Sequence, residues 1–323
     1  MEMALILVES DRSIRFRKKD GEWERMVYLE KKQIGFILSD IDGTILDHKH
    51  QIDLDLIEEI KRLKQQAVPF VLASARSPKG MLPIAQELGL EDWPLACYNG
   101  ALIGRYDQQG TLVPIFSHEV KKAEAKTLVA RIKADFPDVS INVYSGDQWY
   151  CERVDQWAQA EAAITKETPV ETSLEQLLAQ EAFEVHKFLL IGTTAEIQAL
   201  HAACQNAGFL ESAFYLSKEN YLEVTHQAVG KDKALNELAA YFQVPLAQTL
   251  AIGDNFNDLP MIASAGIGVA MENAPELVKT KADFVTASNT DHGVADALRR
   301  FVTGYIKKLG FLNKLIDFHF YSP

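Results

Sequence analysis

Residues 36–47 read FILSDIDGTILD, a short apolar run that leads directly into two aspartates one position apart. Aspartate is uncommon in strands and neighbouring carboxylates repel each other, so this arrangement needs a chemical reason. Residues i and i+2 of an extended chain point to the same side, so Asp40 and Asp42 can face one pocket where the strand ends. Two carboxylates held together favour either a shared proton or a divalent cation.

The chain around this stretch alternates between predicted strands and helices. Buried strands are expected at 34–39, 68–74 and 94–100, because each is a short, mostly apolar run. Helical spacing of apolar residues predicts a helix at 53–66, with Asp53 as its N-cap. This order is typical of a parallel sheet with right-handed crossovers, so we predict an α/β fold.

A second domain interrupts the α/β pattern. Between about 102 and 224, hairpin-like segments mix with helices, which predicts an α+β insert at 102–224. The αβ alternation resumes with an amphipathic helix at 231–242 and a buried strand at 248–254. We therefore expect one core domain formed by 34–101 together with 225–323.

The two ends of the chain lie outside this pattern. Residues 1–33 form a predicted appendage, in which alternation on both sides of Asp20 and Gly21 indicates a β-hairpin. The apolar tail at 301–323 predicts a helix docked on the core or a dimer contact, so a monomer and a homodimer both stay open.

Bulk composition narrows the class of protein. The chain has 323 residues, 47% of them hydrophobic, and a net charge of −12, which disfavours non-specific binding to nucleic acid or to an anionic membrane. No apolar run is long enough to span a membrane. Three scattered cysteines fit reduced thiols, so we expect a cytoplasmic protein.

A second acidic cluster lies far along the chain, in AIGDNFNDLPM at 251–261. Asp254 and Asp258 follow an apolar strand, with Asn255 and Asn257 between them. In an α/β sheet, two such strand ends meet at the same edge, where ligands bind. Oxygen ligands of this kind suit Mg²⁺, which keeps open positions for a phosphate.

A calcium-binding EF-hand loop is the competing explanation for Asp40 and Asp42. Counted from Asp40, that loop requires glycine at position six and glutamate at position twelve. Those positions hold Ile45 and Gln51, so the sequence excludes it.

A phosphate site also needs cationic and hydrogen-bonding groups. Ser74, Ala75 and Arg76 follow the second predicted strand. Lys231 opens a predicted helix, whose dipole adds to the attraction for an anion.

Four segments in order resemble the signatures of haloacid-dehalogenase-superfamily (HAD) phosphatases: DIDGT, SAR, GKDKAL and GDNFNDLPM. The chain is most similar to the Cof-like branch, subfamily IIB, over roughly residues 34–301, and YNGA at 98–101 resembles the family's step into its cap domain. The resemblance implies a Rossmann-like core with a parallel sheet, and identifies the insert as an α+β cap that sets specificity.

The resemblance also implies roles for individual residues. Asp40 would attack phosphorus and become an aspartyl-phosphate, and Asp42 would act as general acid and then as general base. Mg²⁺ would be held by the Asp40 carboxylate, the Asp42 carbonyl and Asp254, with Asp258 in support. The implied phosphoryl-gripping groups are the Ile41 amide, Ser74, the Ala75 amide, Lys231 and Asn257, and Asn99 and Gly100 would lie at the cap entry.

The sequence departs from the family pattern at two positions. Ser74 stands where threonine is commoner, which keeps the hydroxyl, and Asp232 stands where glycine is usual, which adds a negative charge beside Lys231. Candidates to line the cap pocket are Tyr144, Trp149, Tyr150 and Arg153.

These observations predict a Mg²⁺-dependent phosphatase of small metabolites, such as sugar phosphates or phosphorylated cofactors. Two alternatives are kept. A phosphomutase or other phosphoryl transferase would use the same aspartates, and a non-catalytic phosphometabolite-binding protein would use the same pocket without turnover.

Overall fold

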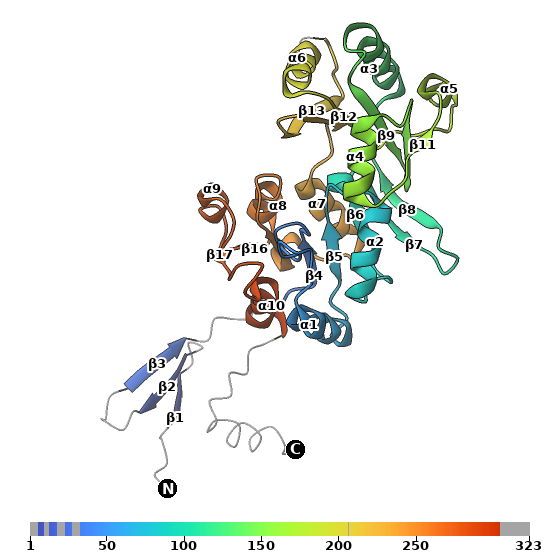
Figure 1. Cartoon of the computed structure of the whole chain (residues 1–323). Coiled ribbons are helices and arrows are strands. Elements are labelled where there is room, and N and C mark those ends of the chain that lie inside the picture. The colour runs from blue at the N-terminus through green and yellow to red at the C-terminus, as the bar shows by residue number, and fades with distance from the viewer. Residues whose placement is uncertain (1–5, 10–12, 18–22, 28–32, 206, 304–323) are drawn as a thin grey trace.

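A computed structural model describes residues 6–9, 13–17, 23–27, 33–205 and 207–303. Its described part contains an eight-stranded sheet, a six-stranded sheet and a three-stranded sheet, as Figure 1 shows.

The eight-stranded sheet positions the residues of interest. Its order is β17-β16-β15-β4-β5-β6-β7-β8, and the run from β17 to β6 is parallel. The strand that precedes Asp40, β4, is central, between β15 and β5. The strands are β4 Phe36–Ser39, β5 Phe70–Ala73, β6 Leu95–Cys97, β7 Leu102–Tyr106, β8 Leu112–Ser117, β15 Thr249–Gly253, β16 Ile267–Ala270 and β17 Phe284–Val285.

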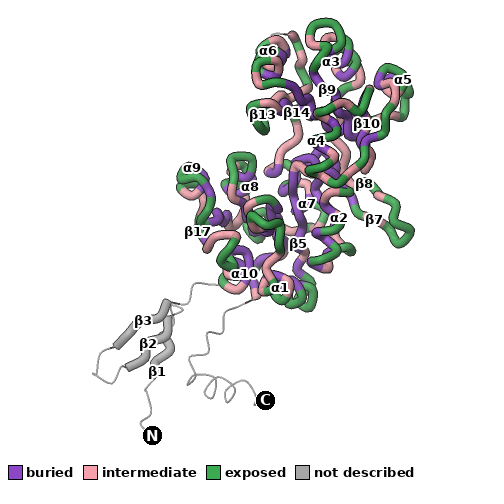
Figure 2. The backbone as a smooth tube through the Cα atoms, viewed as in Figure 1, coloured by how far each residue is buried: buried purple, intermediate pink, exposed green. Residues whose placement is uncertain are grey.

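Helices cover both faces of this sheet, which explains why its central strands are apolar on both sides. Phe36 and Leu38 pack with buried residues of α7 and α8, whereas Ile37 packs with those of α1, α2 and α10. Figure 2 shows the buried strands enclosed in this way. The helices are α1 Leu54–Gln65, α2 Pro78–Glu87, α7 Lys231–Tyr241, α8 Leu259–Ser264, α9 Glu276–Lys279 and α10 Gly293–Leu298, with shorter helical turns at Tyr98–Gly100, Leu246–Gln248 and Arg299–Thr303.

The predicted α/β class is therefore confirmed, and local sequence accounts for the helix starts. Asp53 caps α1, since its side chain accepts a hydrogen bond from the Asp55 amide at 2.9 Å. Ser77 caps α2 in the same way, and Pro78 occupies the first helical turn.

The six-stranded sheet forms the centre of the insert, with order β11-β10-β9-β12-β14-β13. One face packs against α3, α5 and α6, and Phe188 and Leu190 belong to that cluster. Tyr144 and Trp149 belong instead to the cluster that contains Tyr98 of the core domain. The elements are β9 Ser140–Ser145, β10 Gln148–Cys151, β11 Val170–Glu171, β12 Lys187–Ile191, β13 Ser212–Lys218, β14 Tyr221–His226, α3 Lys122–Asp135, α4 Gln156–Thr165, α5 Leu174–Ala179 and α6 Thr194–Gln205.

The structure corrects the expected start of the insert at residue 102. Strands β7 and β8 form the predicted hairpin, but β7 pairs antiparallel with β6, so residues 102–117 extend the eight-stranded sheet. The hairpin signal covers only β7 and β8, whereas the choice of sheet depends on the pairing of β7 with β6 across the short turn at Tyr98–Gly100, which the alternation pattern does not specify. From here on, we call residues 118–224 the cap, and the rest of the chain from residue 33 to residue 303 the core.

The N-terminal strands are β1 Ile6–Glu9, β2 Ser13–Arg17 and β3 Trp23–Val27, and β2 pairs antiparallel with both neighbours. The helix predicted in the tail falls mostly on residues 304–323, which lie outside the described part of the chain.

The three cysteines are buried free thiols, in line with the expectation of no disulfide frame. Among the described residues, the helices are too short or too polar to cross a membrane.

A buried histidine joins the cap to the β7–β8 hairpin. The Gly146 amide donates to His186 Nδ1 at 3.0 Å, so the ring proton lies on Nε2, which is 3.0 Å from Ser117 Oγ. Burial lowers the pKa of His186 to about 4, and this outweighs the opposite effect of Glu119. The folded protein therefore holds this ring neutral.

We expect His186 to make the protein acid-sensitive. Its folded pKa lies below the ordinary value of 6.5, so its contribution to stability is present above pH 6.5 and is lost as pH falls towards 4. The loss approaches about 3 kcal/mol when complete. Urea unfolding at pH 7 and pH 4.5 should show a smaller difference for His186→Gln than for the wild type. The control is His201→Gln, at a partly exposed histidine on α6, and an unchanged pH difference in His186→Gln would contradict the assignment.

Candidate active site

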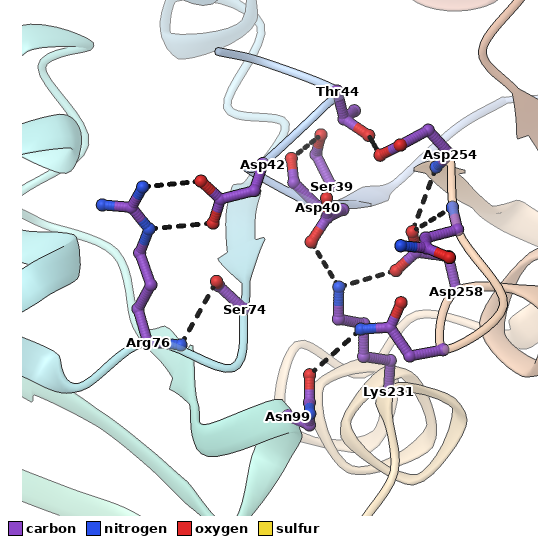
Figure 3. Close-up of polar contacts among 12 residues, drawn as sticks. Ser39, Asp40, Asp42, Thr44, Ser74, Arg76, Asn99, Lys231, Asp254 and Asp258 are labelled. Atoms are coloured by element: carbon purple, nitrogen blue, oxygen red, sulfur yellow. Dashed lines mark hydrogen bonds and ion pairs between the residues drawn. The ribbon is translucent and has the colours of Figure 1, made fainter. Parts of the chain in front are cut away.

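Three separate parts of the chain meet at the carboxyl edge of the eight-stranded sheet. Asp40 follows β4, Ser74 follows β5 and Asp254 follows β15, and these strands are parallel neighbours. Asn99 follows β6 at the same edge. Figure 3 shows these side chains, with Asp40 bonded to Lys231, Ser74 beside Arg76 and Asp254 beside Thr44. The convergence expected of the two acidic segments is therefore present.

The centre of this group is a buried charged cluster. Lys231, the first residue of α7, donates through its ammonium to Asp40 Oδ1, and also to Asp258 Oδ1 at 2.6 Å. The side chains of Lys231, Asp40 and Asp258 are 1%, 8% and 0% exposed, so water contributes little to their solvation. Buried charges persist only when they are paired in this way.

Burial also perturbs the ionisation of the cluster. It raises the pKa of Asp40 to about 8, a rise that Lys231 opposes and the charge of Asp258 reinforces. Burial raises the pKa of Asp254 to about 6, against the hydrogen bond from Thr44. Burial alone would lower the pKa of Lys231, but Asp40 and Asp258 raise it overall. The ammonium therefore stays charged and cannot neutralise all of its neighbours.

The Asp254 carboxylate is held against the loop that follows Asp40. Thr44 Oγ1 donates to Asp254 Oδ1 at 2.7 Å. Gly43 has φ +85°, and a Cβ there would come within 2.4 Å of Asp254 Oδ2. Glycine is needed at this position both for its left-handed backbone and for the close approach of the carboxylate.

Both carboxylate oxygens of Asp258 accept hydrogen bonds from the protein. Its Oδ1 accepts from Lys231, and its Oδ2 accepts from the amides of Asp254 and Asn255 at 3.0 and 2.9 Å. These bonds fix the loop after β15. The supporting role expected for Asp258 is consistent with this geometry.

The residues fit a divalent cation. Oxygen atoms of Asp40, Asp254 and Asp258 lie within 4.8 Å of one another. Three carboxylates and one ammonium carry a formal charge of −2 when all are ionised, and Lys231, Asp40 and Asp258 are buried. A hard divalent cation bound by the oxygens of Asp40 and Asp254 would neutralise this charge.

Asp42 takes a different direction from Asp40. Its carboxylate makes a two-point contact with Arg76, at 2.8 Å to Nε and 2.6 Å to Nη2, and its side chain is 47% exposed. Figure 3 shows this pair on the opposite side of Asp40 from Lys231. Strand alternation would have allowed the two aspartates to face one pocket. The loop instead turns directly after β4, so the alternation of a strand no longer applies.

The remaining expected residues line the edge between core and cap. Asn257 Nδ2 donates to Asn99 Oδ1 at 3.4 Å, and Asn99 has φ 57°. Gly100 has φ +100°, and a Cβ there would meet Ala234 of α7 at 3.0 Å. Ser74 Oγ accepts from the Arg76 amide at 3.3 Å.

Two other expected residues belong to the loops at this edge. Ile41 is buried in the loop after β4, and Ala75 follows Ser74 after β5. The extra charge at Asp232 lies 3.6 Å from the Lys233 ammonium.

Of the four cap candidates, two lie on the side of the cap sheet that faces the core. Tyr144 and Trp149 are buried there and stack on each other with ring centroids 5.8 Å apart. Tyr150 instead contacts Phe183 and packs with the cap's own core, because neighbouring strand residues point to opposite faces. Arg153 is 65% exposed beside Asp155, so it is a surface residue.

Sequence reasoning gave no role to two residues that the structure brings to the site, Thr44 and Lys187. Thr44 stood inside the quoted motif DIDGT, so its motif position was the available signal. Arg76 was named as a cationic group for a phosphate, but its contact with Asp42 was not foreseen. Lys187 reaches the Ala75 carbonyl from the cap at 3.0 Å. Its position in an apolar strand carried no such signal.

Comparison with known proteins identifies the family to which this chain belongs. The family model for haloacid dehalogenase-like hydrolases matches residues 37–298, and the chain belongs to that family.

Relatives and solved structures agree with this. The chain is 34% identical over 260 residues to a putative phosphatase of Haemophilus influenzae, covering 80% of this chain and 95% of that protein. It is 26% identical to the pyridoxal phosphate phosphatase YbhA of Escherichia coli, with the same coverage of 80% and 95%. The crystal structure of TM0651 from Thermotoga maritima superposes with a TM-score of 0.75 at 29% identity, covering 83% of this chain and 97% of that one.

Magnesium should stabilise the folded protein through the acidic cluster. Thermal unfolding with MgCl₂ should give a higher Tm for the wild type, equivalent to about 2.7 kcal/mol at a hundredfold excess over Kd, and little change for Asp254→Ala. The effect should grow between pH 6 and pH 8, because protons compete with the cation for Asp40 and Asp254, whose pKa values are raised to about 8 and about 6.

Without metal, the stability of the protein changes with pH in the opposite direction. Raised folded pKa values mean that the native state binds more protons than the unfolded chain, so stability falls as pH rises through this window. Asp135→Asn, an exposed change on α3, is the control. A Mg²⁺ response in Asp254→Ala as large as that of the wild type would contradict the site.

Proposed function

We propose that the protein is a Mg²⁺-dependent phosphatase that hydrolyses small phosphorylated metabolites through an aspartyl-phosphate on Asp40. The observation that carries the proposal is the buried cluster of Asp40, Asp254, Asp258 and Lys231 at the carboxyl edge of the sheet. Such a cluster is costly to bury without a function or a cation to offset it.

Asp40 is the proposed nucleophile. Its Oδ1 is held by Lys231, so the carboxylate has a defined direction, and its burial removes competing water. Bound Mg²⁺ would screen the repulsion between this carboxylate and an anionic phosphate. Lys231 and the Ser74 hydroxyl would bind phosphoryl oxygens, where charge is stabilised in the transition state.

Asp42 is the proposed general acid, and Arg76 controls where its carboxylate points. The two-point contact with Arg76 must loosen before Asp42 can protonate a leaving oxygen. The partial exposure of both side chains leaves room for that rotation, because neither is packed into the domain core. After departure of the alcohol, the same carboxylate would accept a proton from the attacking water.

The substrate class rests on the family and on the cap. A relative named a pyridoxal phosphate phosphatase supports phosphorylated cofactors as one class to test. The cap face that carries Tyr144 and Trp149 lies over the core, where it would exclude water from a bound metabolite. Sugar phosphates are the second class.

Replacing Asp40 tests the nucleophile. Asp40→Asn removes the attacking charge and should reduce phosphate release from p-nitrophenyl phosphate with Mg²⁺ by at least about 10³-fold, with the fold retained by circular dichroism. Mass spectrometry after an acid quench should detect phosphate bound to the wild type and none on Asp40→Asn. Phosphate release by the variant at a rate close to wild type would refute covalent catalysis.

Replacing Asp42 tests the general acid. Asp42→Asn should slow hydrolysis of an alkyl phosphate by about 10²–10⁴-fold, the usual contribution of a general acid, and slow p-nitrophenyl phosphate much less. Nitrophenolate is a good leaving group that needs little protonation. An equal loss of rate for both substrates would show that Asp42 is not the general acid. The control is Asp47→Asn, in the loop that follows.

Two alternatives have their own readouts. A phosphomutase or other transferase would pass the phosphate to an added sugar rather than release it, which product analysis distinguishes. A binding protein without turnover would bind phosphorylated metabolites in calorimetry and release no phosphate.

A further inference from the structure

A second buried lysine crosses from the cap to the core. Lys187 starts β12, and its side chain is 8% exposed. Its ammonium donates to the carbonyl oxygen of Ala75, in the core loop after β5, at 3.0 Å. It also lies 3.4 Å from Glu223 Oε2 of β14. A buried ammonium is unfavourable unless it is paired, so these contacts fix its position.

Aromatic rings from both domains enclose this ammonium. It lies 5.1 Å from the ring centroid of Tyr144 in the cap and 5.6 Å from that of Tyr98 in the core, within the range of cation–π attraction. The rings exclude water from the contact between Lys187 and Ala75. The hydrogen bond therefore forms in a low-dielectric environment, where it is stronger.

The Ala75 carbonyl is connected to Ser74 through a single peptide unit. That unit joins Ala75 to Arg76, and its N–H donates to Ser74 Oγ at 3.3 Å. A donor on the carbonyl oxygen polarises the peptide and strengthens its N–H as a donor. A hydroxyl has one proton and two lone pairs. When Ser74 Oγ accepts the bond from the Arg76 amide, its own proton therefore stays available to donate to another acceptor. In the proposed phosphatase, that acceptor is a phosphoryl oxygen.

A second set of polar contacts connects Glu223 of the cap to Asn99 and Asn257 in the core. The Tyr215 hydroxyl donates to Glu223 Oε2 at 2.9 Å, and Asn99 Nδ2 donates to the Tyr215 oxygen at 3.4 Å. Asn99 Oδ1 in turn accepts from Asn257 at 3.4 Å. Glu223 thus touches both Lys187 and Tyr215, and each of these reaches a core loop of the phosphate pocket.

We infer that Lys187 is a positioning residue that makes the phosphate grip of Ser74 depend on docking of the cap. When the cap is docked, Lys187 orients the Ala75–Arg76 peptide and, through it, the Ser74 hydroxyl. When the cap lifts, the peptide loses that donor and the hydroxyl is less restricted. The inference rests on the proposed function, and it adds a link between the cap and the phosphate loop that does not require the cap to touch the phosphate.

The test is a double-mutant cycle on the binding of inorganic phosphate with Mg²⁺, measured by calorimetry on the full chain. Lys187→Met should weaken phosphate binding by about tenfold, the effect of losing one charge-assisted hydrogen bond. In the Ser74→Ala background the same change should alter Kd by less than about twofold, because the route ends on the missing hydroxyl. Equal effects in both backgrounds would overturn the inference.

A second variant separates positioning from simple neutralisation of Glu223. Lys187→Met leaves a buried carboxylate without its ammonium and can destabilise the cap, so Lys187→Met/Glu223→Gln removes both charges together. If Lys187 acts through Ala75, phosphate binding stays weak in this double variant. Recovery of the wild-type Kd would show that Lys187 only balances Glu223.

The matched control is Tyr98→Phe. It removes a different hydrogen bond between core and cap, from the Tyr98 hydroxyl to the Gly146 carbonyl at 3.0 Å, and keeps the ring beside Lys187. Its effect on phosphate Kd should persist unchanged in the Ser74→Ala background. A coupling to Ser74 as large as that of Lys187 would contradict the specific route.

Failure of the proposed function gives a different result. A wild type that releases no phosphate but still shows the coupling in phosphate Kd would overturn the phosphatase and keep the positioning role. If the wild type releases phosphate but the effects of Lys187→Met and Ser74→Ala on phosphate Kd are additive, the proposed phosphatase activity stands and the positioning role of Lys187 is overturned.

Discussion

The pairing of one buried ammonium with two buried carboxylates is the constraint on which this core depends. Lys231 bonds to Asp40, 191 residues away, and to Asp258, 27 residues away. Removing one partner of such a buried group typically costs about 3–5 kcal/mol, since the remaining charge is left without solvation. The start of α7 and the ends of β4 and β15 must therefore meet. That meeting also creates the excess negative charge that a divalent cation would neutralise.

A second buried ammonium links the two domains. Lys187 contacts the loop after β5, whereas Lys231 contacts the loops after β4 and β15. Both lysines come from the first residue of a regular element, β12 or α7, and both reach the same edge of the core sheet. The edge is thus held from the core side and from the cap side, and His186, next to Lys187, adds a neutral contact at the same junction.

Local patterns predicted most of the core because they are set by short-range physics. The apolar runs at β4, β5, β6 and β15 are strands buried on both faces, and Asp53 caps α1 as its position indicated. The two acidic segments were expected at one sheet edge because parallel strands share a direction. The hairpin at 102–117 was also predicted, but its sheet was not, since two antiparallel strands can extend either domain.

The sequence by itself determined the αβ order, the acidic segments that follow β4 and β15, and the family motifs that contain Ser74 and Lys231. Only the tertiary structure decided which groups touch. It turned Asp42 towards Arg76, and it paired Lys187 with the carbonyl of a loop 112 residues away. The reason is physical: strand and helix periodicity depends on neighbours in the chain, whereas pairing of buried charges depends on which distant segments exclude water together.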